Sequence, residues 1–342
     1  MTTLIRAAAL INYFEVAAHL GLNPQPLLRK VGLSRARLAD PEQRIPLVAV
    51  VELLETSAEA SACPTFGLRM AESRQLSNFG VVSLLLSHQP TLREALLAIM
   101  RYRHLLNDSL AMHVEEAGKF VIIREELVGD TALPSRQGIE LALGVLARMG
   151  SAVLGPNWHP ASVNFSHSAP ADLQVHRRVF HCSVHFDAEF NGIVCHTADL
   201  ERPNPNADPA MARYAKQFVE SLPGVSDTSI AHEVRKAIYL MLPMGRATIE
   251  QIADGLGMHV RTLQRQLEAA DTQFSDLVNE VRRELVVRYM ENASYSLATI
   301  SELLGYSMPS SFTRWFTAQF GASPQQWRAR KKKPAGGRAR PA

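Results

Sequence analysis

The stretch TIEQIADGLGMHVRTLQRQLE, residues 248–268, and the stretch SLATISELLGYSMPSSFTRWFTAQFG, residues 296–321, follow one pattern. Each has a small residue, a Gly four positions later, and an apolar residue six or seven positions beyond it: Ala253, Gly257 and Leu263, then Ser301, Gly305 and Phe312. The small residue lets two helices cross closely, the Gly adopts a positive φ in the turn, and the apolar residue packs between the helices. Two such hairpins in tandem predict an all-α DNA-binding domain with two helix-turn-helix units.

The second helix of each hairpin is the expected recognition helix, whose outward face reaches base edges in the major groove. We expect the first to start near His259 and to bury Leu263 and Leu267, and the second to start at Pro309 and to bury Phe312 and Phe316. The predicted DNA-contacting residues are His259, Arg261, Thr262, Gln264 and Arg265 in the first unit, and Ser310, Ser311, Thr313 and Arg314 in the second. The alternative is that these are ordinary solvated helix faces.

A helix over 274–292 is expected to join the two units. It carries both signs of charge, with Arg282, Arg283 and Arg288 against Glu280, Glu284 and Glu291, so we expect much of this charge to form ordinary pairs along the helix, such as i,i+4 pairs. A single rigid helix between the two helix-turn-helix units predicts that the two recognition helices contact adjacent major-groove segments, about 34 Å apart, on one face of the DNA.

Composition and charge fit this interpretation. The chain has 342 residues, 46% hydrophobic and 20% charged, which is typical of a globular protein with two domains. From residue 226 onward there are 16 Lys and Arg against 11 Asp and Glu, whereas the first 225 residues hold 20 against 22, so the basic excess lies with the helix-turn-helix units. Three cysteines and no stretch of about 20 apolar residues predict a cytoplasmic protein without a membrane span.

The N-terminal part is predicted to be an α+β domain. Residues 1 to about 75 look wholly helical, a β-hairpin is expected over 110–127, and short strands are expected later. The other expected segments are helices at 47–60, 80–87, 91–107, 135–154, 171–179 and 209–222, and strands at 162–166, 184–186 and 192–196. The expected domains are 1–222 for effector binding and dimerisation, a linker at 223–229, DNA binding at 230–328, and a disordered basic tail at 329–342.

The stretch GYSMPSSFTRWFTAQFGASPQQWR, residues 305–328, resembles the signature of the AraC/XylS family of transcriptional regulators. The residues that carry the resemblance are Gly305, Tyr306, Ser310, Phe312, Arg314, Phe316, Gly321, Ser323, Pro324, Trp327 and Arg328. The resemblance covers about 230–330. It implies base-facing positions at Arg261, Gln264 and Arg265 in the first unit, and at Ser310, Ser311, Thr313 and Arg314 in the second. Ser301 departs from the family's usual Ala but is also small.

Three N-terminal stretches resemble the effector domain of the ornithine-utilisation and alkane-response regulators: LIRAAALINYFEVAAHLGLNP, FGVVSLLLSHQPTLREAL and HFDAEFNGIVCHTADLERPNPNADP. That subclass lacks the cupin barrel of the arabinose-type regulators. The resemblance implies a domain that binds a small-molecule effector and forms a homodimer. It leaves the effector unidentified, and an activator of this kind would have RNA polymerase as a partner.

Candidate effector-pocket residues are Phe79, Arg101, Tyr102 and His104, since Arg101 offers a cation to an anionic ligand. The alternatives are a basic helix end that complements the helix dipole and ordinary core packing. The histidines and cysteines over 181–196 come close to a metal-ligand spacing but contain no Cys-x-x-Cys, so we expect neither a metal nor a cofactor.

Two alternative functions stay open. A DNA-modifying enzyme could use the same DNA-binding module with a reactive cysteine, but Cys63 and Cys182 have no matching catalytic frame in the sequence, so we expect no enzyme. A regulator without any effector is the other alternative.

Overall fold

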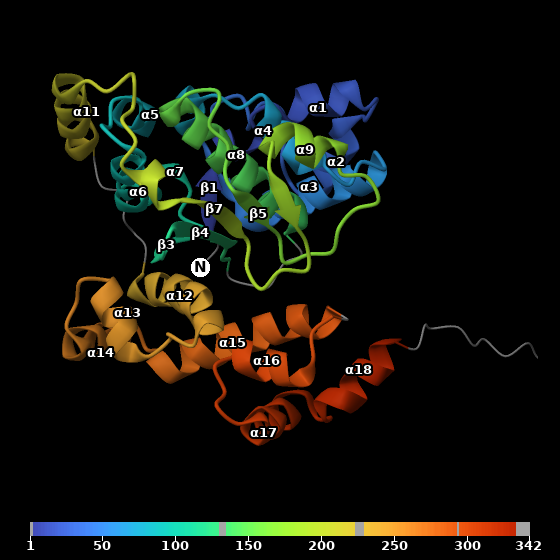
Figure 1. Cartoon of the computed structure of the whole chain (residues 1–342). Coiled ribbons are helices and arrows are strands. Elements are labelled where there is room, and N and C mark those ends of the chain that lie inside the picture. Colours follow the sequence, from blue (N-terminus) through green and yellow to red (C-terminus); the bar gives the residue numbers. More distant parts are fainter. Residues whose placement is uncertain (1–2, 130–134, 223–228, 293, 333–342) are drawn as a thin grey trace, which may run out of the picture. The chain divides into compact units, whose positions relative to one another are not determined.

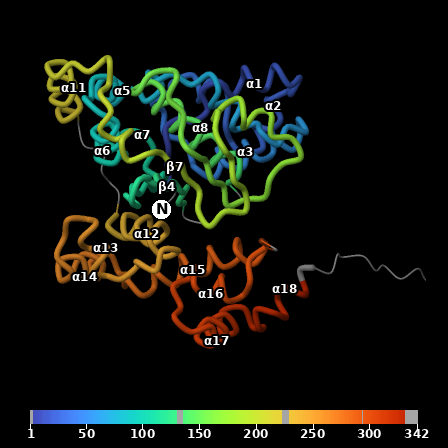
Figure 2. The backbone as a smooth tube through the Cα atoms, viewed as in Figure 1, coloured from blue at the N-terminus to red at the C-terminus, as the bar shows by residue number. Residues whose placement is uncertain are grey.

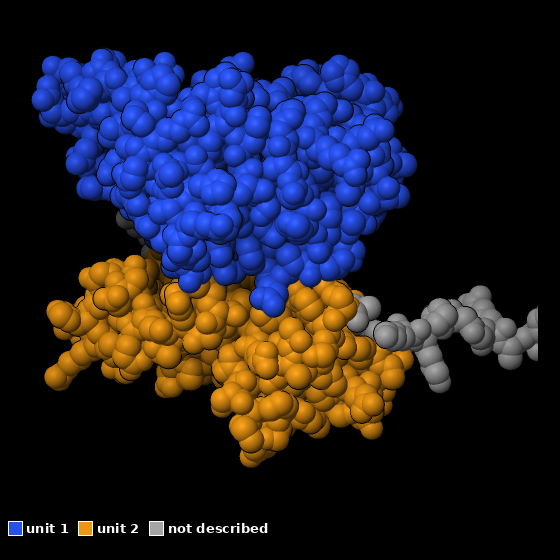
Figure 3. Space-filling model, viewed as in Figure 1, with its two compact units in different colours: residues 1–228 blue, residues 229–342 orange. Residues whose placement is uncertain are grey.

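The computed structural model describes residues 3–129, 135–222, 229–292 and 294–332. The chain divides into two compact units, residues 1–228 and 229–342 (Figure 3). The predicted linker at 223–229 lies outside the described residues except for Ser229.

The N-terminal unit is α+β, as the sequence predicts. Its first part holds β1 (Leu4–Arg6), η1 (Ala7–Leu10), α1 (Tyr13–His19), α2 (Pro24–Lys30), β2 (Arg44–Pro46), α3 (Leu47–Ala60), α4 (Phe66–Glu72), η2 (Leu76–Phe79), α5 (Val82–Ser87), α6 (Leu92–Arg101) and α7 (Arg103–Leu106). There follow β3 (Leu110–Ala117), β4 (Phe120–Leu127), α8 (Arg136–Leu154), β5 (Ser162–Asn164), α9 (Gln174–Phe180), β6 (Ser183–His185), β7 (Gly192–His196), α10 (Thr197–Leu200) and α11 (Pro209–Ser221).

The described strands form an open five-stranded sheet of order β3-β4-β7-β5-β6 and a separate pair, β1-β2. In the larger sheet, β5 and β6 are parallel and the other neighbours are antiparallel. The register places Ile123 opposite Ile193, and Ile193 opposite Val163; all three side chains are buried on the core side.

The helix α8 is the core helix of this unit and packs on α3, α4 and β4 (Figure 1). By length and composition α8 alone among the described helices could cross a membrane, but 67% of its apolar window is buried inside the protein. That burial is what a core helix requires, because its apolar faces are covered by neighbouring elements.

The prediction that residues 1 to about 75 are wholly helical is wrong. The strand β1 pairs with β2, with Ile5 opposite Ile45 and both side chains buried. The apolar spacing near the N-terminus suits a helix, but pairing with a segment about 40 residues away overrides it.

The single helix expected over 91–107 is also wrong, since Tyr102 has φ −106° and ψ 20° and separates α6 from α7. The predicted cap of that helix is present, because the Thr91 hydroxyl accepts a hydrogen bond from the Glu94 amide.

In the described part of the C-terminal unit all regular elements are helices. It comprises α12 (Ile230–Met241), η3 (Leu242–Met244), α13 (Ile249–Gly255), α14 (Val260–Ala269), α15 (Phe274–Glu291), α16 (Leu297–Leu303), α17 (Pro309–Phe320) and α18 (Pro324–Lys332). The tube in Figure 2 shows α13 and α14 toward one end of α15, and α16 and α17 toward the other.

The tail predicted to be disordered from residue 329 is helical as far as Lys332, so that boundary is wrong. Ser323 and Gln326 form a reciprocal capping box at the start of α18, and Pro324 occupies its first turn. The following Arg, Ala and Lys residues are good helix formers, so the capped helix continues past the expected end. Residues 333–342 lie outside the described part of the chain.

Candidate nucleic-acid interface

The first helix-turn-helix unit is formed by α13 and α14. Thr248 caps α13 by accepting a hydrogen bond from the Gln251 amide, and Gly257 turns the chain with φ +66°. Ala253 of α13 and Leu263 and Leu267 of α14 are all buried, and the two helices pack against each other. The residues expected to build this hairpin therefore do so, and α14 begins directly after His259.

The second unit is formed by α16 and α17. Gly305 turns the chain with φ +71°, and the small Ser301 is 1% exposed. Phe312 and Phe316 of α17 are buried, and their rings meet edge to face with centroids 5.7 Å apart. Replacement of the usual Ala by Ser at 301 thus leaves the close crossing intact.

The predicted DNA-contacting side chains lie on the outward faces of α14 and α17. His259, Arg261, Gln264 and Arg265 are exposed, and Thr262 is half-buried. In α17, Ser310, Thr313 and Arg314 are exposed and Ser311 is half-buried; the Thr313 hydroxyl donates to the Pro309 carbonyl.

Three of these side chains are arginines: Arg261, Arg265 and Arg314. Within the described part of the chain, none of the three makes an ion pair with an acidic residue. Their charges therefore remain available to an anionic partner such as a phosphate or to a guanine edge.

The connecting helix α15 runs from Phe274 to Glu291, as predicted, but two of its charged residues bond to other elements. Arg282 donates to the Leu304 carbonyl and stacks over the Tyr306 ring, while Glu284 pairs with Arg235 of α12. For Arg282 and Glu284 the expected pairing along α15 is wrong, because neighbouring segments offer more buried partners. These contacts connect α15 both to α12 and to the second helix-turn-helix unit.

In the N-terminal unit, Glu220 of α11 joins two of the four candidate effector residues. Its carboxylate accepts from Arg101 Nη2 and from the Tyr102 hydroxyl, each at 3.1 Å. Burial and the bond to Glu220 raise the pKa of Tyr102, which therefore remains a phenol that can donate. The structure places Phe79 at the end of η2, and His104 in α7, where the His104 carbonyl accepts from Arg44.

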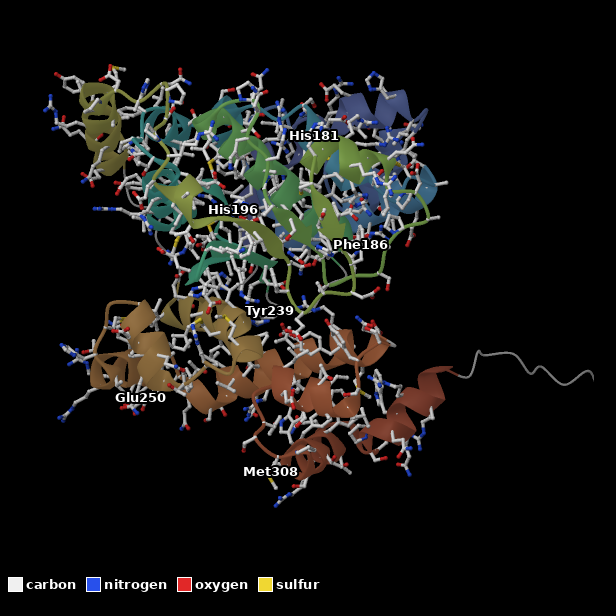
Figure 4. All side chains as sticks on the ribbon, viewed as in Figure 1. His181, Phe186, His196, Tyr239, Glu250 and Met308 are labelled. Carbon is white, nitrogen blue, oxygen red and sulfur yellow. The ribbon has the colours of Figure 1, made fainter. Side chains whose placement is uncertain are left out.

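The N-terminal unit also contains a buried polar cluster that was not predicted from the sequence. Glu140 of α8 is fully buried, and its Oε1 lies 3.2 Å from Arg136 Nε, 3.3 Å from His167 Nε2 and 3.4 Å from His176 Nε2. The ring of Phe186, labelled in Figure 4, meets His176 edge to face at 5.2 Å. An acidic residue inside an apolar helical stretch was the available signal, but its two histidine partners come from segments 27 and 36 residues away.

The histidines and cysteines considered for a metal do not assemble into one site. Within the residues that the structure describes, no three His, Cys, Asp or Glu side chains are arranged to hold a metal ion. The His196 ring packs at a tilt against Phe120, and the His181 ring against His159, so these imidazoles have ring partners. Burial raises the pKa of Cys195 to about 12 and that of Cys182 to about 11, so both remain thiols near neutral pH. A thiol is a poor nucleophile, which disfavours Cys182 as the reactive cysteine of that alternative.

Two family models match the chain. The arabinose-binding domain of AraC transcription regulator, N-term, matches residues 21–204, and a helix-turn-helix domain matches residues 252–330.

Three relatives agree with these matches. The HTH-type transcriptional regulator VirS of Mycobacterium tuberculosis (strain H37Rv) is 32% identical over 329 residues, which cover 96% of this chain and 97% of the relative. The ornithine utilization regulator of Pseudomonas aeruginosa is 24% identical over 323 residues, covering 92% and 93%. The HTH-type transcriptional activator CsvR of Escherichia coli is 31% identical over 111 residues, covering 32% and 41%.

The relatives are named as transcriptional regulators, which agrees with the prediction of a regulator and not an enzyme. The predicted resemblance and fold class are likewise confirmed. An effector-type domain followed by two helix-turn-helix units, matched over almost the whole length of a known regulator, identifies the chain as a member of the AraC family of DNA-binding transcriptional regulators.

Proposed function

We propose that this regulator is a sequence-specific activator that a small-molecule effector controls through the N-terminal unit. It works as a homodimer, with RNA polymerase as its partner at the promoter. Residues 1–222 serve effector binding and dimerisation, and residues 230–328 bind DNA. Because DNA and RNA polymerase are its partners, its proposed location is the cytoplasm. The observation that carries the proposal is the pair of exposed recognition faces on α14 and α17.

The two recognition helices differ in what they offer to bases. α14 and its N-cap contribute His259, Arg261, Thr262, Gln264 and Arg265, of which the Arg and Gln side chains suit guanine and adenine edges. α17 contributes Ser310, Ser311, Thr313 and Arg314. Its Ser and Thr side chains are shorter, so its direct base contacts depend more on Arg314. We therefore assign more direct base contacts to the first unit than to the second.

The length of α15 supports reading of two adjacent groove segments. At 18 residues it spans about 27 Å along its axis, close to the roughly 34 Å between successive major grooves on one DNA face. Its contacts with α12 and with Leu304 connect both hairpins to this one helix.

Selection of binding sites from random DNA with the full chain tests this proposal. Arg265→Ala and Arg314→Ala should each weaken binding to the selected site by about 5- to 150-fold and relax the preference at one base position. Arg29→Ala, which removes an exposed positive charge from the N-terminal unit, is the matched control and should change neither. If both variants keep the base preferences of the wild type, Arg265 and Arg314 do not contact the bases.

The activator role rests on CsvR, which is named an activator and is similar over about a third of this chain. A promoter fusion carrying the selected site should gain transcription when the chain is expressed. Reduced transcription from the same fusion would make it a repressor.

Effector control rests on the contact of Glu220 with Arg101 and Tyr102. Arg101 is 63% exposed, so an anionic effector can reach it from solvent and compete with the Glu220 carboxylate. Release of Glu220 would loosen the end of α11, the last described helix before the predicted linker. An effector can shift the equilibrium between the bound and released states only through unequal affinity for them.

A thermal-shift screen of amino acids, fatty acids and alkane or aromatic metabolites on the full chain tests effector binding. A ligand at 100 times its Kd stabilises the protein by about 2.7 kcal/mol. Arg101→Ala should abolish the shift and Arg29→Ala should retain it. A regulator without an effector, the alternative, would show no shift with any compound.

The homodimer is proposed to form through the exposed face of α11. One face of this helix buries Ala215 and Val219 and the helix packs beside α5, as Figure 1 shows. The other face exposes Met211, Tyr214 and Phe218, at the spacing of one helical stripe. Three large apolar side chains on one exposed stripe are typical of an interaction surface.

A further inference from the structure

The helices of the C-terminal unit are capped unequally. Four begin with a Ser or Thr whose hydroxyl accepts a backbone hydrogen bond: Ser229 of α12, Thr248 of α13, Ser296 of α16 and Ser323 of α18. His259 and Met308, which precede the recognition helices α14 and α17, make no such bond, and neither does Gln273 before α15. A missing cap lowers helix stability by about 1 kcal/mol, so the three uncapped helices are less stabilised at their starts than the four capped ones.

Met308 departs furthest from what a helix start requires. Its carbonyl accepts from the Ser311 amide, so it is the N-cap by geometry, and its backbone is extended with φ −129° and ψ 124°. Its side chain is 58% exposed, and among the described residues of this unit it is the only large hydrophobic side chain that is exposed. Figure 4 labels it at the outer edge of α17.

An exposed apolar N-cap lowers both helix stability and solubility, so local preference alone does not account for it. The first residues of a recognition helix are those that contact base edges. In the major groove, the apolar group that a base edge presents is the C5 methyl of thymine. An exposed, flexible thioether at this position suits that methyl, because Met adapts its shape to irregular apolar surfaces.

We propose that Met308 is a specificity-determining residue that selects thymine by packing its side chain against the C5 methyl in the groove read by α17. The proposal rests on DNA reading by α17, proposed above. His259 holds the corresponding N-cap position of α14 and offers ring nitrogens in place of an apolar surface. The two units therefore present different chemistry at equivalent positions, so the two halves of the DNA site differ in sequence.

Replacement of thymine by deoxyuridine removes only the methyl group and so tests the contact directly. We would measure the affinity of the full chain for the selected site, with each thymine replaced in turn. Loss of one methyl contact should weaken binding of the wild type by about three- to tenfold at one position in the segment read by α17.

Two substitutions of Met308 separate this contact from helix stability. Met308→Ser introduces a good N-cap and should bind the thymine and deoxyuridine sites equally. Met308→Leu keeps an apolar side chain and should retain the discrimination. A melting temperature of Met308→Ser at or above that of the wild type excludes misfolding as the cause.

Arg314→Ala separates failure of this proposal from failure of the proposed function. If no methyl removal distinguishes the wild type from Met308→Ser while Arg314→Ala still weakens binding, the assignment of Met308 alone is overturned. If Arg314→Ala also binds normally, α17 does not read DNA and both proposals fail.

Discussion

At the residue scale, Glu125 links the stability of the N-terminal unit to pH. It follows Val121 and Ile123 on the core-facing side of β4 and is 2% exposed. Burial raises its pKa from 4.5 to about 8, and its Oε2 has no hydrogen-bond partner. The buried carboxyl is therefore protonated in the folded protein at neutral pH, although the unfolded chain has already released that proton.

We predict that Glu125→Gln removes this dependence. Between pH 4.5 and about 8 the folded state binds one more proton than the unfolded state, so stability falls as pH rises. The slope is at most about 1.4 kcal/mol per pH unit, and it vanishes in the variant. Unfolding of the full chain followed at pH 5 and pH 8 should show similar stability at pH 5 and a more stable variant at pH 8.

Glu59→Gln, at an exposed position of α3, is the control and should follow the wild type at both pH values. Parallel pH profiles for Glu125→Gln and the wild type would show that Glu125 is ionised in the folded protein.

At the element scale, the crossing of α4 over α8 depends on Gly67. Its amide donates to Gln137 Oε1 at 2.9 Å, and Gln137 Nε2 donates to the Pro64 carbonyl at 3.0 Å. A Cβ at position 67 would lie 2.1 Å from the Gln137 carbonyl oxygen, a backbone atom that cannot rotate away. The two helices approach closely because this residue has no side chain.

We predict that Gly67→Ala destabilises the N-terminal unit by about 1–3 kcal/mol, since an added methyl in a tight crossing forces the backbones apart. Differential scanning calorimetry of the full chain should show a lower melting temperature for this unit. Gly255→Ala, at a helical position where nothing lies within 4 Å of the new Cβ, is the control and should leave stability unchanged or slightly higher. An unshifted transition for Gly67→Ala would mean that α4 and α8 can separate at no cost.

At the scale of the whole molecule, the exposed stripe of α11 predicts how two copies assemble. Phe218→Glu places a charge where the proposed interface excludes water, and we expect the dimer dissociation constant to rise at least tenfold. Sedimentation velocity at several concentrations measures this. Leu4→Glu adds the same charge at a distant exposed apolar position and should leave the dimer unchanged. A Phe218→Glu protein that remains dimeric would place the interface elsewhere.

Much of the C-terminal unit could be predicted from the sequence because its determinants are local. The crossing residues, turn glycines and apolar anchors lie within 12 positions of one another in each hairpin. The cap of α13 and the left-handed turn at Gly257 likewise depend on the residues at and beside them. The hairpin of β3 and β4 was predictable for the same reason, because its strands are adjacent in the chain.

The sequence by itself therefore determined the family, the two hairpins and the exposed residues of each recognition helix. The tertiary structure decided the pairing of Ile5 with Ile45, the cluster around Glu140, and the bonds of Arg101 and Tyr102 to Glu220. It also decided that Arg282 bonds to Leu304 and not to a glutamate of its own helix. Apart from Arg136 and Glu140, which share α8, these contacts join residues that are 22 or more positions apart. Their energy therefore depends on how distant segments meet and leaves no periodic trace in the chain.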